Sequence, residues 1–378
     1  MIDRREFIGA AGLAALAAAS HPVFAAAAAP PRWKPYRDTL AIDALGGTEL
    51  FYLKPDDPGV PKALQALREC GLSGIMASPA PYGRYWYTDQ AYADTKQRVE
   101  EWKAAIARYP DAMLLVRDGA DLRRAQRERL VGMIFTFQGT EPLGEDVERI
   151  AQFREQGVRV MQLTHNRRNL VGDGCMEPGN AGLSNFGHQV VERLNAEKMV
   201  VDLAHGSQRT IREAILASKA PVLIGHTGCR ALSDVPRMVH DAELKLLADR
   251  GGVAGIIFWP YLREQGQQTS ADVIRHIEHA IKVCGEDHVG IGTDLNLTAV
   301  DITPEYVKEN TEMIKGMIED GIFEQGRDPN LLLFVPDLNT ADRFETLAAM
   351  LSARGHSDAR IAKILGGNFA RVMTEVWG

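Results

Sequence analysis

Short apolar runs rich in valine and isoleucine recur along this chain, and a segment of helix length separates each run from the next. Buried parallel strands have this appearance, and the segments between them carry apolar residues at three- and four-residue spacing, as helices do. Eight strands alternating with helices predict an α/β fold, a (β/α)8 TIM-type barrel, more readily than an open doubly wound sheet. The eight predicted strands are residues 40–45, 73–78, 132–137, 158–164, 200–204, 221–225, 253–258 and 289–293.

Three of these runs, VVDLAH, PVLIGH and VGIGTD, end in His205, His226 and Asp294. The carboxyl ends of barrel strands meet at the active-site face, so two imidazoles and a carboxylate placed there indicate a metal site. The alternative is that all three are ordinary strand-end polar residues that pair with neighbouring loops.

Two long insertions lie in the same predicted barrel. Residues 81–92 form an aromatic cluster between the second and third strands, and residues 166–183, rich in Gly, Asn and Asp, follow the fourth. Loops at the carboxyl face build substrate pockets. The side chains of Tyr82, Tyr85, Trp86 and Tyr87 either form a substrate lid or pack the insertion on the barrel. We also expect a helical extension at the C-terminus.

The overall composition excludes several classes of function. The formal net charge is -7 and no basic cluster is present, which argues against nucleic acid or an anionic membrane as partner. No glycine-rich phosphate-binding motif follows any strand. The four cysteines, Cys70, Cys175, Cys229 and Cys284, lack CxxC spacing, so zinc ribbons and thioredoxin-like chemistry are excluded. Buried free thiols are the favoured interpretation, and no disulfide pairing is predicted.

The first residues have the pattern of an export signal. Arg4 and Arg5 precede a 12-residue apolar stretch, which is short of the about 20 residues that a bilayer span needs. We expect a twin-arginine-type signal peptide at 1–25, a flexible leader at 26–37 and one barrel domain at 38–378. The protein is then exported to the periplasm and has no membrane span after processing.

Five blocks in this order carry a family resemblance: LTHNRRNLVGDG, VVDLAHGSQRT, PVLIGHTGCRALSDVPR, VGIGTD and ILGGNFARV. From about residue 38 to its end the chain resembles the membrane (renal-type) dipeptidases, peptidase family M19 of the amidohydrolase superfamily. The resemblance implies a β/α barrel with two zinc ions bridged by a carboxylate, which hydrolyses dipeptides and tolerates a D-residue on the carboxyl side.

The resemblance also implies roles for individual residues. His205 and His226 correspond to the histidines of the second zinc, and Asp294 to the aspartate that binds the first zinc and takes a proton from the attacking water. His165 matches the histidine that contacts the developing tetrahedral oxygen, and Arg237 the arginine that holds the substrate carboxylate. A peptide hydrolase needs a polarised water, an oxyanion contact and a cationic clamp, so these residue types suit the chemistry.

The chain departs from the family pattern at the first metal. Leu45 and Gly47 stand where the family has a histidine and an aspartate, in the block IDALGG, and Gln138 stands where it has the bridging glutamate. A glutamine is a much weaker zinc ligand than a carboxylate. The sequence therefore predicts one zinc, held by His205, His226, Asp294 and a water with weak support from Gln138. The alternative is a second zinc ion, which would be bound if Asp43 or Glu49 replaces the lost ligands.

The expected function is zinc-dependent hydrolysis of dipeptides in the periplasm. A catalytically altered or inactive protein of the same fold, which binds a peptide-like ligand, is the alternative. The sequence leaves open which dipeptide is the substrate and whether the chain forms a homodimer.

Overall fold

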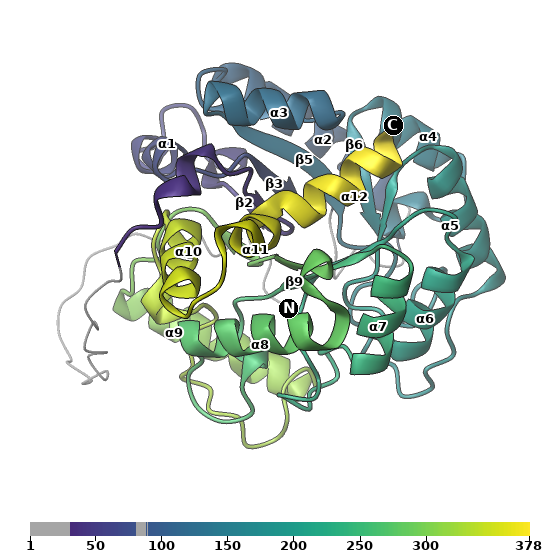
Figure 1. Cartoon of the computed structure of the whole chain (residues 1–378). Helices are drawn as coiled ribbons and strands as arrows, with labels where there is room; N and C mark the ends of the chain where they lie inside the picture. Colours follow the sequence, from purple (N-terminus) through teal and green to yellow (C-terminus); the bar gives the residue numbers. More distant parts are fainter. Residues whose placement is uncertain (1–30, 81–87, 89) are drawn as a thin grey trace.

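The strands form one nearly closed parallel barrel in the computed structural model, which describes residues 31–80, 88 and 90–378 (Figure 1). All eight predicted strands are present, and they are adjacent in chain order. They are β1 (Ile42–Asp43), β3 (Gly74–Ala77), β5 (Val131–Phe137), β6 (Val158–Gln162), β7 (Val200–Asp202), β8 (Leu223–Thr227), β9 (Val253–Ile256) and β10 (Val289–Ile291). The predicted barrel is confirmed, with most strands shorter than their apolar runs.

The seam of the barrel lies between β10 and β1. Ala44 N donates to Ile291 O at 3.0 Å, and Asp294 N donates to Leu45 O at 2.7 Å. Just beyond these bonds, β2 (Gly46–Gly47) pairs in parallel with β11 (Leu295–Asn296). The first and last strands are therefore joined at the end of the barrel where the predicted site residues lie.

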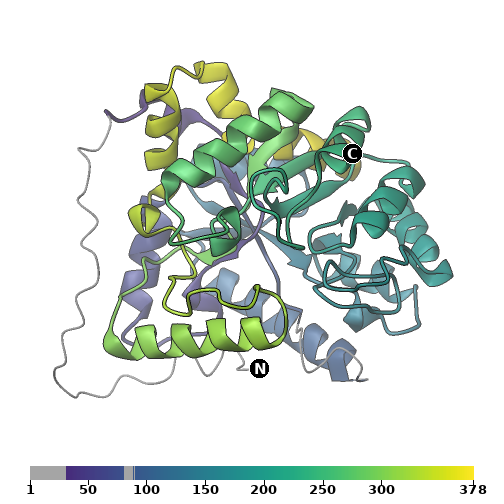
Figure 2. The same cartoon turned by 90° about the horizontal axis from the view of Figure 1, so that it is seen from below.

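Helices surround the strands, as the view from below also shows (Figure 2). They are α1 (Val60–Glu69), α2 (Gln90–Arg108), α3 (Gly119–Glu128), α4 (Arg149–Glu155), α5 (Asn185–Ala196), α6 (Gln208–Ala217), α7 (Asp241–Asp249), α8 (Ser270–Cys284), α9 (Pro304–Glu319), α10 (Arg343–Ala353), α11 (Asp358–Ala362) and α12 (Asn368–Trp377). Side-chain caps start several of them: Asp118 accepts from Ala120 N and Asp121 N, and Ser207 accepts from Thr210 N. No helix among the described residues is long and apolar enough to cross a bilayer.

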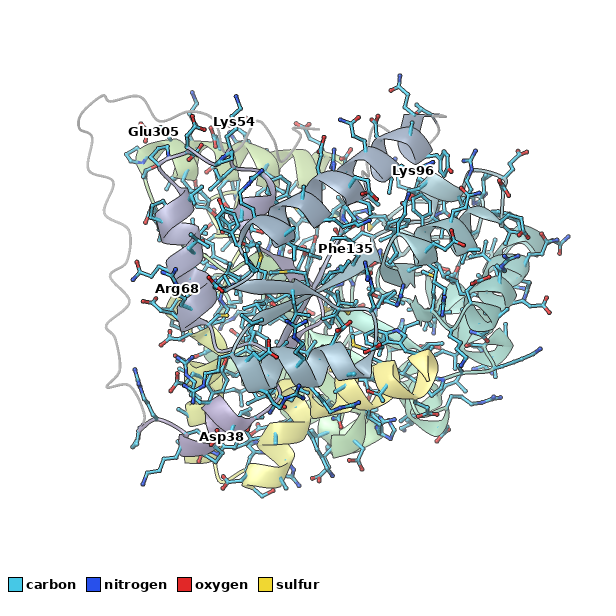
Figure 3. All side chains as sticks on the ribbon, turned by 90° about the horizontal axis from the view of Figure 1, so that it is seen from above. Asp38, Lys54, Arg68, Lys96, Phe135 and Glu305 are labelled. Carbon is cyan, nitrogen blue, oxygen red and sulfur yellow. The ribbon has the colours of Figure 1, made fainter. Side chains whose placement is uncertain are left out.

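Two apolar layers make up the core. One packs the outer faces of the strands against the helices and includes Phe135 (Figure 3), whereas charged side chains such as Lys54 and Glu305 lie at the surface. The other fills the barrel at the beginnings of its strands, where Phe369 and Val372 of α12 pack against inward-facing residues such as Ile42. The helical extension at the C-terminus therefore closes one end of the barrel (Figure 1), and the other end is left for the site.

Strands β8, β9 and β10 approach one another closely at three glycines. A Cβ atom on Gly255 or on Gly292 would lie 2.1 Å from the Gly225 carbonyl oxygen. Only glycine allows these strands to approach so closely, which brings the loops after them together at the mouth.

The described part of the expected flexible leader is packed against the barrel. Residues 26–30 lie outside the described residues, but Trp33 and Tyr36 are buried and Lys34–Asp38 form a short 3-10 helix, η1. Tyr36 OH donates to Cys70 O at 2.5 Å, and Trp33 Nε1 donates to Asp358 Oδ1 at 2.7 Å. The two aromatic side chains anchor this segment on the barrel, so the packed domain begins at least five residues before the expected boundary.

The insertions also have defined places. Beyond the aromatic cluster, and still between the second and third predicted strands, β4 (Met113–Leu115) pairs with β5 outside the barrel order. The aromatic residues Tyr82, Tyr85, Trp86 and Tyr87 lie outside the described residues. The second insertion is held by bridges from Gly172 to Leu183 and from Gly174 to Gly206. The four cysteines are free, as expected, and of these Cys70 and Cys229 are buried.

Candidate active site

Two predicted site histidines face each other at the carboxyl end of the barrel. His226 lies within β8 and is fully buried, and His205 follows β7 and is 8 % exposed. Their Nε2 atoms are 2.9 Å apart. Burial, followed by the charge of Arg237 and the neighbouring His165 and His226, holds the pKa of His205 well below its usual range. His205 is therefore a neutral imidazole, the form that binds metals.

His165 joins this pair from β6. Its ring stacks on that of His205 with centroids 4.1 Å apart and planes inclined by 24°. The rings of His205 and His226 meet edge to face at 4.9 Å. Three predicted site residues from three neighbouring strands thus form one cluster.

Two site residues have an unusual backbone conformation. His205 has φ of 62° and Asp294 has φ of 58°, in the left-handed region that non-glycine residues seldom adopt. The backbone carbonyl oxygens of both residues accept hydrogen bonds: Cys175 N donates to His205 O at 2.7 Å, and Trp259 Nε1 donates to Asp294 O at 3.0 Å. Strain of this kind is concentrated at functional sites, where the surroundings hold it.

Arg237 contacts the histidine cluster through His226. It is 3 % exposed, and its Nη2 donates to the His226 carbonyl oxygen at 2.8 Å. Its Nε is buried and has no hydrogen-bond partner within the described part of the chain. A buried guanidinium with a donor left over in this way suits an anionic ligand such as a carboxylate.

The histidine pair fits part of a metal site. Zinc–nitrogen bonds of about 2.0–2.1 Å place two ligands of one tetrahedral ion about 3.3 Å apart, so the two Nε2 atoms, 2.9 Å apart, would have to separate by a few tenths of an ångström to hold one ion. In the described ranges, however, no three His, Cys, Asp or Glu side chains are grouped as a metal requires. The predicted set of His205, His226 and Asp294 is therefore not assembled here. Strand β9 lies between the strands of His226 and Asp294, and the Asp294 backbone is fastened to Leu45 and Trp259.

The position of the family's first metal does not fit a metal. Leu45 is buried and has no donor atom, and a Cβ atom on Gly47 would lie 2.7 Å from Asn296 Oδ1. Gln138 is buried after β5, and its backbone carbonyl oxygen accepts from Gln162 Nε2 at 2.9 Å; its side chain carries an amide where the family has a carboxylate.

The two carboxylates left open as substitutes have other partners. Asp43 accepts from Thr293 N at 2.8 Å and from Thr293 Oγ1 at 2.6 Å, and Glu49 accepts from Thr298 Oγ1 at 2.5 Å. Both are therefore bound to the segment around β11 rather than to the histidine cluster.

Sequence reasoning missed two residues of this site. Tyr261, in the short helix η4 (Pro260–Leu262) after β9, is buried, and its phenol interacts electrostatically with Arg237 and Asp294. Burial raises the pKa of this phenol, so it is a neutral hydroxyl at pH 7. Asn166 is the other, because its Oδ1 lies 2.7 Å from His205 Nδ1. Tyr261 lies just after the seventh predicted strand, and Asn166 directly follows His165.

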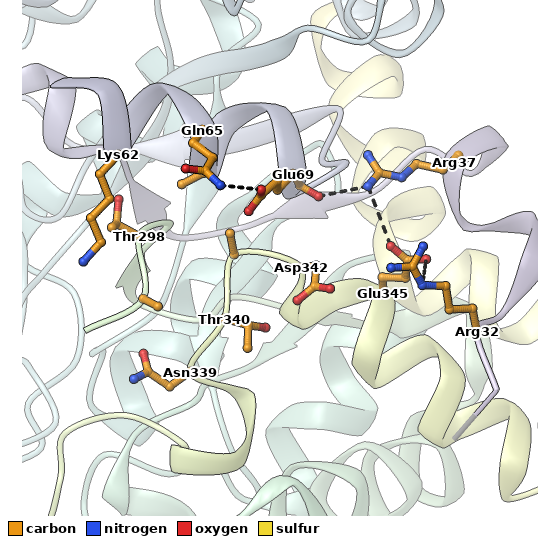
Figure 4. A pocket seen from close by; sticks show the side chains of 13 residues that line it. Arg32, Arg37, Lys62, Gln65, Glu69, Thr298, Asn339, Thr340, Asp342 and Glu345 are labelled. Atoms are coloured by element: carbon orange, nitrogen blue, oxygen red, sulfur yellow. Dashed lines mark hydrogen bonds and ion pairs between the residues drawn. The ribbon is translucent and has the colours of Figure 1, made fainter. Parts of the chain in front are cut away.

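Two cavities differ in their relation to the cluster. One, of about 320 Å³, adjoins it: Cys175 and Gly206 beside His205, and Pro236 and Met238 beside Arg237, line its wall. The other, of about 540 Å³, lies by α1 and the start of α10 and is lined by Arg32, Arg37, Lys62 and Glu345 among others (Figure 4). No predicted site residue lines the second cavity.

A parallel barrel with paired histidines and a buried arginine at the carboxyl ends of its strands defines a barrel of the amidohydrolase type. Residues 60–326 match the membrane dipeptidase family, peptidase family M19. The chain belongs to this family, and the resemblance expected from the five sequence blocks is confirmed. Family membership implies a metal cofactor.

Similar proteins agree with this assignment. A dipeptidase (verJ) from Clonostachys rogersoniana is 28 % identical over 284 residues, which are 75 % of this chain and 65 % of the relative. The chain thus spans just under two thirds of that relative's length. A crystal structure of an amidohydrolase from Pseudomonas aeruginosa is 27 % identical, with a TM-score of 0.77 and coverage of 91 % of this chain and 98 % of the other. A metallopeptidase from Rhodobacter sphaeroides, liganded with a phosphinate mimic of L-Ala-D-Ala, shares the fold at 19 % identity, with a TM-score of 0.72 and coverage of 90 % and 100 %.

Proposed function

We propose that this protein hydrolyses dipeptides at a single zinc ion held by His205 and His226. The observation that carries the proposal is the pair of buried Nε2 atoms 2.9 Å apart, in a member of a metallopeptidase family. Asp294 is proposed as the third ligand, after a movement of its side chain toward the histidines. A zinc ion bound there would lower the pKa of a water ligand to about 7 and polarise the peptide carbonyl.

The remaining residues have roles that follow from their surroundings. Arg237 holds the C-terminal carboxylate of the dipeptide, because it is a buried cation whose Nε has no hydrogen-bond partner among the described residues. His165 contacts the developing oxyanion from its stacked position on His205. Asp294 takes the proton of the attacking water, and the Tyr261 hydroxyl donates a hydrogen bond to the substrate.

Metal analysis together with a dipeptide panel tests this function. Protein purified without chelator should contain one zinc per chain and cleave dipeptides, including some with a D-residue on the carboxyl side. His226→Ala should lose both the zinc and the hydrolysis, since it removes one of the two facing nitrogens. A metal content near zero in the wild type would contradict the proposal.

A second function is favoured by the incomplete metal site. Leu45, Gly47 and Gln138 replace three ligands, and the described residues hold no three-ligand group. The same pocket would then bind a peptide-like ligand without cleaving it. Calorimetry with a phosphinate mimic of L-Ala-D-Ala, in the presence and absence of EDTA, distinguishes the two: binding that EDTA leaves unchanged, with no turnover of any dipeptide, supports the second function.

We also propose that the protein is exported to the periplasm, because Arg4 and Arg5 precede the short apolar stretch. The twin-arginine pathway recognises the arginine pair itself, whereas lysine keeps only the charge. The double change Arg4→Lys and Arg5→Lys should therefore trap precursor in the cytoplasm, as measured by fractionation and immunoblotting. Undiminished mature protein in the periplasm would exclude this route.

A further inference from the structure

The cavity of about 320 Å³ beside the histidine cluster extends from the loop of Arg237 to the start of α7. One part of its wall is Pro236 and Met238, the two neighbours of Arg237, and another is Glu243 in the first turn of α7. This volume lies at the lower end of small-molecule sites, about 300–1,000 Å³, so the cavity suits a single amino-acid side chain. Because Arg237 is proposed to hold the C-terminal carboxylate of the dipeptide, the side chain of the C-terminal residue is the part that would enter the cavity.

Glu243 places a buried carboxylate in this wall. The residue is 3 % exposed, and within the described part of the chain its carboxylate has one hydrogen-bond contact, to Gln208 Nε2 at 3.5 Å, the outer limit for such a bond. A buried carboxylate costs free energy unless a cation or several donors compensate it. The first turn of α7 offsets part of this cost through the helix dipole, but among the described residues no cation forms an ion pair with Glu243.

The other charged groups of the wall leave a negative field in the cavity. Arg230 is matched by an acid, because its Nε donates to Asp234 Oδ1 at 2.6 Å. Glu177 is not matched by a cation, since its Oε1 accepts from the backbone amide of Arg168 at 2.8 Å. The imidazole of His240 also lines the cavity. The uncompensated charges are thus carboxylates, which favour a cationic ligand. The apolar part of the wall is formed by Pro178, Ile211, Pro236, Met238 and Val239.

We propose that this cavity is the subsite for the C-terminal side chain of the dipeptide, and that Glu243 makes it select a long cationic side chain such as that of lysine. The apolar wall packs against the methylene stem, and the ammonium group at its end pairs with the carboxylate. Glu243 is then a specificity-determining residue. This inference rests on the proposed function for the orientation of the dipeptide at Arg237, and it requires neither a metal nor cleavage.

Two ligands that differ only in the ammonium group test the proposal. L-Ala-L-Lys and L-Ala-L-norleucine share the same straight carbon stem, and the second lacks the charge; the corresponding pair with a D-residue on the carboxyl side is measured in parallel. In the wild type, kcat/KM should be about 10- to 100-fold higher for the lysine dipeptide, which is the factor that a charge-assisted hydrogen bond supplies. Calorimetry of the same pair with EDTA-treated protein should give the same ratio of Kd values without any turnover.

Two variants in the first turn of α7 separate direct pairing from the general field of the helix. Glu243→Gln keeps the size of the side chain and removes its charge, so the preference for lysine over norleucine should be lost in both measurements. Asp241→Asn is the matched control: it removes the same charge from the same turn, but Asp241 accepts from His279 Nε2 at 2.9 Å and does not line the cavity. This variant should keep the preference of the wild type.

The outcomes distinguish this subsite from the proposed hydrolysis. Cleavage without a preference for lysine, or a preference that Glu243→Gln keeps, overturns the subsite and leaves the hydrolysis standing. A preference for lysine in binding, with no cleavage of any dipeptide, refutes the hydrolysis and supports the subsite. If the dipeptides are neither bound nor cleaved, both proposals are wrong. If Glu243→Gln does not fold, the ratio between the two ligands in the wild type still decides, because an apolar wall without an active carboxylate would favour norleucine.

Discussion

Two residues at the mouth of this barrel, His205 and Asp294, are held in an unusual backbone conformation by hydrogen bonds. His205 and Asp294 keep left-handed backbones because hydrogen bonds from Cys175 and Trp259 fix their carbonyl oxygens. Such conformations cost about 1–3 kcal/mol each and persist only where the surroundings over-determine them. Two of the three residues that family resemblance assigns to the metals thus have backbones that the fold constrains.

Arg237 offers a prediction at this scale. Arg237→Gln should raise KM for dipeptides by about 10- to 100-fold, because a charge-assisted hydrogen bond contributes about 1.5–3 kcal/mol. Steady-state kinetics of dipeptides and their C-terminal amides check it. The wild type should prefer the free acid and the variant should show no preference; an unchanged preference in the variant would mean that another residue holds the carboxylate.

Among the elements, the junction of β1 with β10 contains a buried carboxyl group, that of Asp43. Asp43 is 2 % exposed and joins β1 to Thr293 through the threonine amide and hydroxyl. Burial raises the pKa of Asp43 from 3.8 to about 7, although the bonds to Thr293 oppose this. The protonated form is therefore the one that the folded barrel favours.

This shift predicts how stability depends on pH. The folded pKa lies above the unfolded one, so the stabilisation is complete below about pH 4 and is lost as the pH rises to about 7. Asp43→Asn stays neutral, so over this range wild type should lose up to about 4 kcal/mol relative to the variant. Urea unfolding at several pH values measures this difference.

The comparison with the variant is needed because Asp202 and Glu141, with pKa values raised to about 6 and about 7, act in the same direction. Asp38→Asn, at an exposed position, serves as control and should follow the wild type. Parallel curves for wild type and Asp43→Asn would show that folding does not raise the pKa of Asp43.

At the scale of the whole molecule, the residues that correspond to the family's two metal positions differ in their surroundings. Histidines from β7 and β8 with Arg237 remain together, whereas Leu45 and Gly47 leave the side near β1 without ligands. Asn296 of β11 lies against Gly47 and takes the space that a side chain there would need. Two of the three departures, Leu45 and Gly47, therefore lie at the seam of the barrel, and the third, Gln138, follows β5.

Restoring the lost ligands tests this description. The changes Leu45→His, Gly47→Asp and Gln138→Glu should raise the zinc content from one to two per chain and increase dipeptide turnover, since a bridging carboxylate would hold both ions. Because Gly47→Asp meets Asn296, we expect the full effect only with Asn296→Ala added. Two zinc ions without turnover would show that the pocket serves another ligand.

Much of this molecule could be read from local sequence. Apolar runs and their spacing determine strands and helices, because burial on both faces of a parallel strand requires continuous apolar residues, and so the eight strands were predicted correctly. The same runs located His205, His226 and Asp294 at one end of the barrel. Aromatic anchors such as Trp33 were missed, because a short polar segment carries no periodicity that would indicate packing.

The tertiary structure alone decided which of these residues meet. The two histidines come from neighbouring strands and face each other at 2.9 Å, whereas Asp294 follows a strand two positions away and is tied to the seam. The bond between Asn166 and His205 spans 39 residues. Contacts of this kind depend on strand register and on the twist of the closed barrel, which no local pattern of residues encodes.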